Sequence, residues 1–259
     1  MIVDYHIHTS LSDGKIKNHR AYIKVALKKK INEIGFSEHL CFKESDWAMK
    51  FSDLPLMVQK VKSLKGKSKI PIKMGIELDY IPGFESELEK VIKNNPFDYV
   101  IGAVHFIGDF GFDDSRNIAE YKKWDIDELY KVYFGLIQKA ANLRLFDIIG
   151  HPDLIKKYGF RPKKSIDKLL KDTADVFKKN KVVIEINTAG LAKPCKEIYP
   201  SKKFLKICFN EKIPIALGSD AHVPEDVGRY FDEAIKLAKE VGYTKIVQFT
   251  RRKRKLIEI

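Results

Sequence analysis

The sequence predicts an α/β protein in which parallel strands form a closed or nearly closed barrel with helices outside it. Short apolar runs alternate with amphipathic, helix-like stretches along all 259 residues. The apolar runs are continuous rather than alternating, which is typical of strands covered by helices. No glycine-rich dinucleotide fingerprint follows any of them, which favours a barrel over a doubly wound open sheet.

Each apolar run predicts one strand, and each is followed by a predicted helix, which gives seven units and a partial eighth. The predicted strands are residues 2–3, 31–36, 70–76, 99–104, 146–149, 182–184 and 213–217, with a last short strand at 245–249. The predicted helices are residues 17–30, 54–64, 84–94, 125–143, 165–179, 201–210 and 226–241, the sixth with Ser201 as its N-cap. Residues 40–52 and 106–117 lack periodicity and predict two long loops. No linker interrupts the pattern, so we expect a single domain over residues 1–259.

The composition narrows the class of protein. The net charge is +13, but the lysines are spread over predicted helix surfaces and are not interleaved with stacking aromatics, which argues against nucleic acid as a partner. The basic cluster 251–255 is interpreted as a charged tail. No apolar run approaches the roughly 20 residues that span a bilayer, and Asp4 and His6 interrupt any signal-peptide pattern. We therefore expect a soluble, cytoplasmic protein whose three cysteines are reduced and structural.

Histidines follow the predicted strands with unusual regularity. Six of the seven come just after apolar runs, where the strand ends of a barrel open onto one face; they are His6, His8, His39, His105, His151 and His222. His19, on the first predicted helix, receives no role. Asp13, Glu77, Glu185 and Asp220 are expected at the same rim. Burying so many imidazoles and carboxylates is costly without partners, and metal ions supply them. The set is too large for one ion, which indicates two or three.

Six motifs occur at the strand ends: His-Ile-His-Thr from residue 6, Ser-Glu-His from 37, Gly-Ile-Glu-Leu-Asp-Tyr from 75, Gly-Ala-Val-His from 102, Gly-His-Pro-Asp from 150 and Gly-Ser-Asp-Ala-His from 218. In this order they resemble the polymerase and histidinol phosphatase (PHP) superfamily, and within it the monofunctional histidinol-phosphate phosphatases. The resemblance implies a distorted seven-stranded TIM-like barrel with a trinuclear metal centre. It also implies hydrolysis of L-histidinol phosphate to L-histidinol and inorganic phosphate, a step of histidine biosynthesis.

The resemblance also assigns ligands to three divalent ions, which mixed histidine and carboxylate ligation leaves open among Zn, Fe and Mn. The implied sets are His6, His8, Glu77 and Asp220 for the first ion; Glu77 as a bridge, His105 and His151 for the second; and Asp13, His39 and His222 for the third. Glu38, Asp153 and Glu185 are expected to orient these ligands. For any one of these histidines, a role in the core is the alternative.

Two ions about 4 Å apart can generate a hydroxide at neutral pH and bind phosphate oxygens, which predicts in-line hydrolysis of a phosphomonoester. Asp220 or His222 would protonate the leaving alcohol, and the sequence does not choose between them. Arg161 resembles a phosphate-binding arginine of the family. Ala192 stands where the family pattern has arginine, and the adjacent Lys193 is expected to substitute for it.

The two long loops are expected to rim the pocket. Their aromatic residues would stack on an imidazole or simply pin the loops down, and acidic residues there would pair with a substrate amine; the aromatics are Phe42, Trp47, Phe106 and Phe110. Two other functions stay open. One is a PHP phosphoesterase acting on nucleotides or nucleic-acid ends, whose activity on DNA would fall steeply with salt. The other is a non-catalytic, metal-stabilised scaffold, against which the intact ligand set argues.

Overall fold

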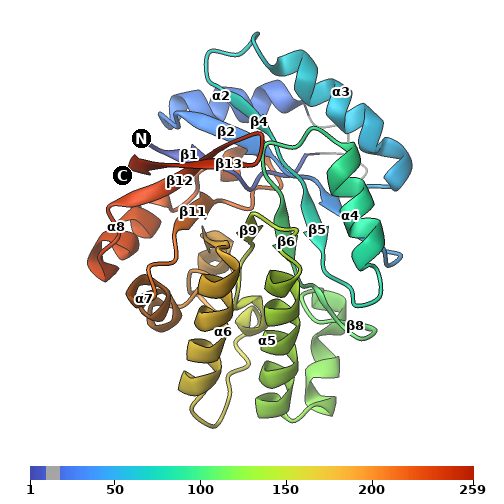
Figure 1. The fold of residues 1–259 in the computed structure, drawn as a ribbon, viewed down its shortest axis with the longest axis vertical. Coiled ribbons are helices and arrows are strands. Elements are labelled where there is room, and N and C mark those ends of the chain that lie inside the picture. Colours follow the sequence, from blue (N-terminus) through green and yellow to red (C-terminus); the bar gives the residue numbers. More distant parts are fainter. Residues whose placement is uncertain (10–17) are drawn as a thin grey trace.

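The structure is a computed structural model that describes residues 1–9 and 18–259. Short parallel strands occupy the middle of the molecule and helices cover them, so the α/β class expected from the sequence is confirmed (Figure 1). One parallel sheet has the order β1-β2-β4, and a second has the order β11-β10-β9-β6-β5-β3. The strands are β1 Val3–Asp4, β2 Glu33–Phe36, β3 His39–Leu40, β4 Ile72–Met74, β5 Glu77–Asp79, β6 Ile101–Ala103, β9 Ile148–Ile149, β10 Val183–Asn187 and β11 Ile215–Gly218.

Backbone hydrogen bonds continue from one parallel sheet to the other. The chain beyond β1 lies between two neighbours: the amide of Tyr5 donates to Leu217 at 3.2 Å, and the amide of Ser37 donates to Ile7 at 2.9 Å. Beyond β2 and β4, the amide of Glu77 donates to Glu38 at 3.0 Å. The ends of strands from both sheets are therefore brought to the same region of the molecule.

Helices alternate with the strands as the hydrophobic pattern predicts. In the longest, α5, the Asp125 side chain caps the first turn and the buried residues follow helical spacing along one face. Ser201 caps α7 as predicted, accepting from the amide of Phe204. The helices are α2 His19–Lys28, α3 Leu54–Leu64, α4 Glu85–Asn94, α5 Ile126–Asn142, α6 Asp167–Asn180, α7 Lys202–Asn210 and α8 Phe231–Val241. The last begins later than predicted because Pro224–Asp226 form a short 3-10 turn and Tyr230 has a left-handed backbone.

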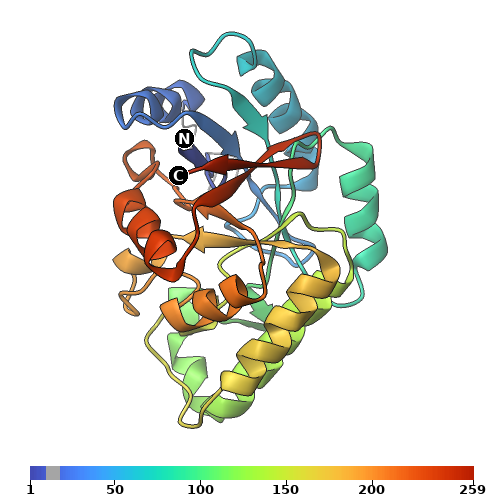
Figure 2. The ribbon, with the colours of Figure 1, turned by 60° about the vertical axis from the view of Figure 1, so that its left-hand side comes forward.

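The C-terminal segment corrects one expectation. Residues 251–255 are not a charged tail, because β12 (Lys245–Thr250) and β13 (Lys253–Glu258) pair as an antiparallel hairpin with Arg251 and Arg252 at its turn. The Arg252 guanidinium binds Asp147 at 2.8 Å, and its amide donates to the Asp98 carbonyl at 2.8 Å. Figure 2 shows the hairpin crossing the strands beside the N-terminus. Arg252, which the sequence analysis assigned to a charged tail, therefore anchors this hairpin to the rest of the fold.

The two predicted loops contain short elements of their own. Residues 40–52 begin within β3 and run into a 3-10 turn at Phe51–Asp53. The second loop contains a small hairpin, β7 Phe106–Ile107 with β8 Phe110–Gly111, followed by a 3-10 helix at Ser115–Lys123. In the described part of the chain, every helix is too short or too polar to cross a bilayer.

Candidate metal centre and substrate cavity

Histidines and carboxylates from separate strands meet around Glu77. Its side chain is fully buried, and its Oε1 lies 2.9 Å from His151 Nε2 and 3.9 Å from His105 Nε2. Its Oε2 contacts His39 Nδ1 and lies 3.3 Å from His6 Nε2. The register explains the meeting, because His39 and Glu77 pair directly across β3 and β5. The structure thus joins residues that are up to 145 positions apart in the chain.

Four ligand atoms in this cluster each lie within 4 Å of two of the others. His6 Nε2 and His8 Nε2 lie 3.3 and 3.6 Å from Glu77 Oε2, and 3.8 and 3.3 Å from Asp220 Oδ1. All four atoms are buried and have no hydrogen-bond partner among the described residues. A tetrahedral zinc ion with bonds of roughly 2.0–2.1 Å would hold its ligand atoms roughly 3.3–3.4 Å apart. The residues present therefore fit a divalent metal ion.

The other predicted ligands adjoin this quartet. His39 Nε2 lies 3.3 Å from His222 Nε2, and the rings of His8 and His39 stack with centroids 3.8 Å apart. Groups whose ligand atoms lie within 4.8 Å of one another are His8, His39 and His222; His6, Glu77 and His151; His6, His8 and Asp220; and His39, Glu77 and His105. All eight of the predicted ligands that the structure describes are members of these groups. The ninth, Asp13, lies outside the described residues.

Mutual perturbation sets the protonation of the cluster. Burial alone would raise the pKa of Glu77, but His39 and His6 outweigh it and hold that pKa well below the ordinary value. Burial, together with the imidazoles of His39 and His222, holds the pKa of His8 well below its ordinary value. A carboxylate that stays ionised and an imidazole that stays neutral are both in the form that binds metal.

Carboxylates behind the cluster hold its imidazoles in place. Glu185 lies 2.6 Å from His6 Nδ1 and accepts from the His151 amide at 2.8 Å, which agrees with its expected orienting role. Asp79 does the same for His105, at 2.8 Å from Nδ1 and 3.1 Å from its amide, although the sequence analysis gave Asp79 no role. The signal was present, because Asp79 is two residues after Glu77 and so lies on the same face of the strand.

The two other predicted orienters make different contacts. Glu38 accepts from the amide of Thr9 at 3.0 Å and from the hydroxyl of the same residue. Asp153 pairs with the buried Lys156 at 2.9 Å and accepts from the Ser201 amide at 2.8 Å. Asp153 therefore braces a loop, whereas Glu38 fixes the residue that follows His8.

Backbone geometry at the cluster is unusual. His151 and Asp220 both have positive φ, 24° and 53°, a conformation that non-glycine residues adopt at a cost and that concentrates at functional sites. Gly218 is required for a different reason. A Cβ at this position would lie 1.8 Å from Glu185 Oε1 and 2.7 Å from His6 Cβ, so any side chain would separate the carboxylate from the imidazole it orients.

A cavity of about 360 Å³ opens beside the cluster, with His39, His105, His151, Asp220 and His222 in its wall. Four cationic side chains also line it: Arg116, Lys157, Lys193 and Arg229. Lys157 donates to the Asp113 carbonyl at 2.6 Å and pairs with its carboxylate at 3.2 Å. Lys193 forms no ion pair within the described part of the chain, and burial, then Lys157, lowers its pKa.

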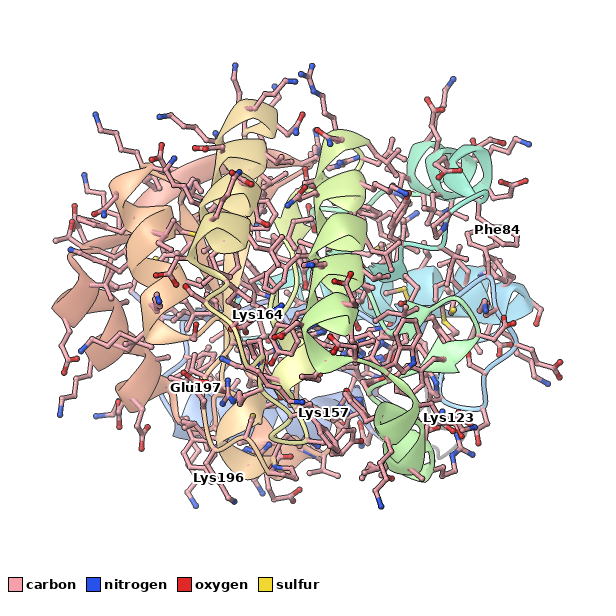
Figure 3. All side chains as sticks on the ribbon, turned by 90° about the horizontal axis from the view of Figure 1, so that it is seen from below. Phe84, Lys123, Lys157, Lys164, Lys196 and Glu197 are labelled. Atoms are coloured by element: carbon pink, nitrogen blue, oxygen red, sulfur yellow. The ribbon has the colours of Figure 1, made fainter. Side chains whose placement is uncertain are left out.

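Arg161 lies elsewhere. It is not among the described residues that line the cavity, and its half-exposed guanidinium binds Glu197 at 2.9 Å. Glu197 also pairs with Lys156 at 3.0 Å. Glu197 and Lys157 come from the loops that follow β10 and β9 (Figure 3). The geometry gives no support to a phosphate contact by Arg161; its position indicates that it braces these loops.

The rim loops contribute one aromatic residue to the cavity wall. Trp47 lines the cavity and meets the rings of His39 and His105 edge-on, at 4.9 and 5.2 Å. Phe106 stacks on Trp47, with the ring centroids 6.1 Å apart. Phe42 instead stacks on Phe84 at 5.3 Å. Phe110 packs on Tyr121 and Trp124 and, like Phe42 and Phe106, is not among the described residues of the wall. These three aromatics therefore pin the loops down.

Fold and site together define an α/β protein whose candidate metal ligands lie beside a cavity lined by cations and carboxylates. A comparison with known families matches residues 4–189 to the PHP domain. The chain is 35% identical to the probable histidinol-phosphatase of Deinococcus radiodurans, over 97% of this chain and 98% of that protein. It is 28% identical to the histidinol-phosphatase of Bacillus subtilis, over 88% of this chain and 96% of that protein. The chain belongs to the PHP family.

A solved structure is similar over nearly the whole length of the chain. It is the histidinol phosphate phosphatase of Lactococcus lactis, crystallised in complex with zinc, L-histidinol and phosphate. The TM-score is 0.86 and the sequence identity 25%, with 98% of each chain covered.

Proposed function

We propose that this protein is a metal-dependent phosphatase that hydrolyses L-histidinol phosphate to L-histidinol and inorganic phosphate, as a step of histidine biosynthesis. The observation that carries the proposal is the quartet of buried, unsatisfied ligand atoms on His6, His8, Glu77 and Asp220, beside a cavity that Asp220 lines together with lysine, arginine and aspartate side chains. The names of the relatives support the substrate, and the Lactococcus lactis protein was crystallised with both products of that reaction.

The metal content that we propose is three divalent ions, chosen from Zn, Fe and Mn. The first would be held by the quartet, the second by Glu77, His105 and His151, and the third by His39 and His222 with Asp13. Bound ions supply Lewis acidity toward phosphoryl oxygens and make water acidic enough to ionise near neutral pH. Glu185 and Asp79 orient the imidazoles of His6 and His105, so the ligand set is held ready before any ion binds.

We further propose that the whole chain is one domain built as a distorted seven-stranded barrel. Seven segments of the chain are joined side by side: 3–8, 33–40, 72–79, 101–103, 148–149, 183–187 and 215–221. The parallel bridge between Ile7 and Ala221 supports closure of the last segment onto the first. Breaks within three of these segments account for their division into two sheets.

Side chains of the cavity account for the handling of the substrate. Lys193, half-buried and without an ion pair in the described chain, is placed to attract the phosphate dianion. Asp220 and His222 stand at the cluster and the cavity together, so either is positioned to protonate the leaving oxygen. Asp46 and Asp114 provide carboxylates for the ammonium group of the substrate, and Trp47 provides a flat wall for its imidazole.

The test is phosphate release from L-histidinol phosphate, beside a nucleoside monophosphate and a single-stranded oligonucleotide. The enzyme is stripped and reloaded separately with Zn, Mn and Fe. We expect metal-dependent preference for histidinol phosphate, loss of turnover in Glu77→Ala, and normal turnover in Glu240→Gln, which removes only an exposed partner of Lys202. Equal or better turnover of the nucleic-acid substrates would refute the assignment of histidinol phosphate as the substrate. Turnover without metal would refute the metal-dependent mechanism.

A further inference from the structure

Arg229 has the features of a residue that binds the substrate rather than one that stabilises the fold. It lies in the loop between His222 and α8 and lines the same cavity as Lys193 and the metal-ligand cluster. Its Nε is buried and has no hydrogen-bond partner among the described residues. A buried guanidinium N–H without an acceptor is unfavourable, so this N–H requires an acceptor that the described residues do not supply.

Two contacts hold this guanidinium, and a third holds the backbone of the residue. Asp226 Oδ1 accepts from Nη1 at 2.8 Å, and the Tyr230 ring lies 5.5 Å from the guanidinium carbon. The Thr188 hydroxyl donates to the Arg229 carbonyl at 2.6 Å, which ties the residue to the loop that carries Lys193. One guanidinium edge is occupied by Asp226, whereas Nε is left for another partner.

The backbone on either side of Arg229 is unusual as well. Gly228 has a φ of 61° and Tyr230 a φ of 59°, so two left-handed residues flank it. Glycine adopts this conformation freely, but a bulky aromatic residue in it is a genuine outlier. Gly228 is anchored by its amide, which donates to Asp4 Oδ2 at 3.0 Å. The chain is therefore bent sharply on both sides of Arg229, whose side chain lines the cavity.

We infer that Arg229 binds the phosphate group of the substrate through its guanidinium, and that Asp226 is the residue that positions it. This inference rests on the proposed phosphatase function and assigns a residue to it. It also accounts for Ala192, because the guanidinium expected at that position is supplied from the neighbouring loop, which Thr188 contacts. Lys193 contributes a point charge, and Arg229 contributes directed N–H groups that suit a tetrahedral oxyanion.

The test measures inhibition by inorganic phosphate, a product of any phosphomonoester hydrolysis, in wild type and in Arg229→Gln. Turnover is followed with L-histidinol phosphate and, separately, with p-nitrophenyl phosphate. Removal of a charged hydrogen-bonding partner is expected to raise the phosphate inhibition constant roughly 10- to 100-fold. Arg144→Gln is the matched control, since this exposed arginine binds Asn180 and is not among the described residues that line the cavity; its inhibition constant should equal that of wild type. Metal content measured on each variant should be unchanged.

Arg229→Lys guards against misfolding of the glutamine variant, because it keeps the charge and the backbone contacts but loses the directed N–H groups. We expect it, too, to bind phosphate more weakly than wild type. An inhibition constant equal to that of wild type in either folded variant would overturn the assignment. If only p-nitrophenyl phosphate is hydrolysed, the proposed substrate fails while the role of Arg229 is still decided by phosphate inhibition.

Discussion

Asp79→Asn tests whether the carboxylates behind the cluster hold the metal ligands in place. Asp79 is 2% exposed, and its Oδ1 accepts from both Nδ1 and the amide of His105. Burial alone would lower the pKa of His105, but Asp79, with Asp113, raises it to about 10, which shows how strongly this carboxylate acts on the ring. Asparagine keeps an acceptor at that place but removes the charge, so the imidazole loses both basicity and fixed orientation.

Loss of such an outer carboxylate lowers metal affinity by about 10- to 100-fold, which corresponds to about 1.4–2.7 kcal/mol. The assay is titration of stripped protein in zinc buffers, with bound metal determined at each free concentration. Asp98→Asn is the matched control: this buried carboxylate binds Lys65 and the Met74 amide, and it precedes β6 whereas His105 follows it. It should lower the free energy of unfolding without changing zinc affinity. Wild-type zinc affinity in Asp79→Asn would refute the reasoning.

Three further outcomes are expected. Lys156→Met should lower the free energy of unfolding, measured in urea, by about 3–5 kcal/mol, because this lysine is 1% exposed and its loss leaves the buried carboxylate of Asp153 without its ion pair. Lys168→Met removes an exposed ion pair on a helix and should change the free energy of unfolding by less than about 0.5 kcal/mol. Equal losses in the two variants would contradict this prediction. Burial, helped by Lys60, lowers the pKa of His19 to about 4, so its contribution to stability is full above pH 6.5 and is lost as the pH falls toward 4. Between pH 7 and 5, the free energy of unfolding of His19→Phe, measured by denaturant titration, should therefore fall by about 2 kcal/mol less than that of wild type. Equal falls in the two proteins would exclude this role of His19. Chelation should lower the melting temperature, because the four ligand atoms of the quartet then lose the ion that satisfies them, and added zinc should restore the melting temperature. A melting temperature that does not respond to chelation would argue against a metal ion at the quartet.

The sequence predicts which side chains meet in the cluster because the rule behind that prediction is geometric. Parallel strands place their carboxyl ends together, so histidines that follow successive apolar runs must meet. The cavity side chains obey no such rule. Arg161 was expected to contact the phosphate group of the substrate, but in the structure its guanidinium forms an ion pair with Glu197. Arg229 carries no local signal, since its place depends on two left-handed residues beside it and on Thr188 from a distant loop.

The C-terminal hairpin shows a second limit. Its turn holds two arginines with positive φ, where turn chemistry favours asparagine or glycine, so the sequence gives no hairpin signal at 251–252. The conformation is held by tertiary contacts: the amides of Arg251 and Arg252 both donate to Asp98, and the guanidinium of Arg252 binds Asp147. Only the folded protein supplies those acceptors.

The distribution of charge bears on the choice between a small phosphomonoester and a nucleic acid. Much of the lysine excess is balanced locally on helix surfaces, as where Lys168 pairs with Asp172 at 2.7 Å, which leaves little for a continuous groove along a phosphate backbone. Inside the cavity, carboxylates accompany the cations. Asp46 and Asp114 share Arg116, whose two nitrogens lie 2.7 and 2.9 Å from the Asp46 oxygens. Carboxylates there repel the successive phosphates of a polymer but attract an ammonium group. A single phosphate attached to a cationic amine satisfies both kinds of side chain, and that combination is what L-histidinol phosphate offers.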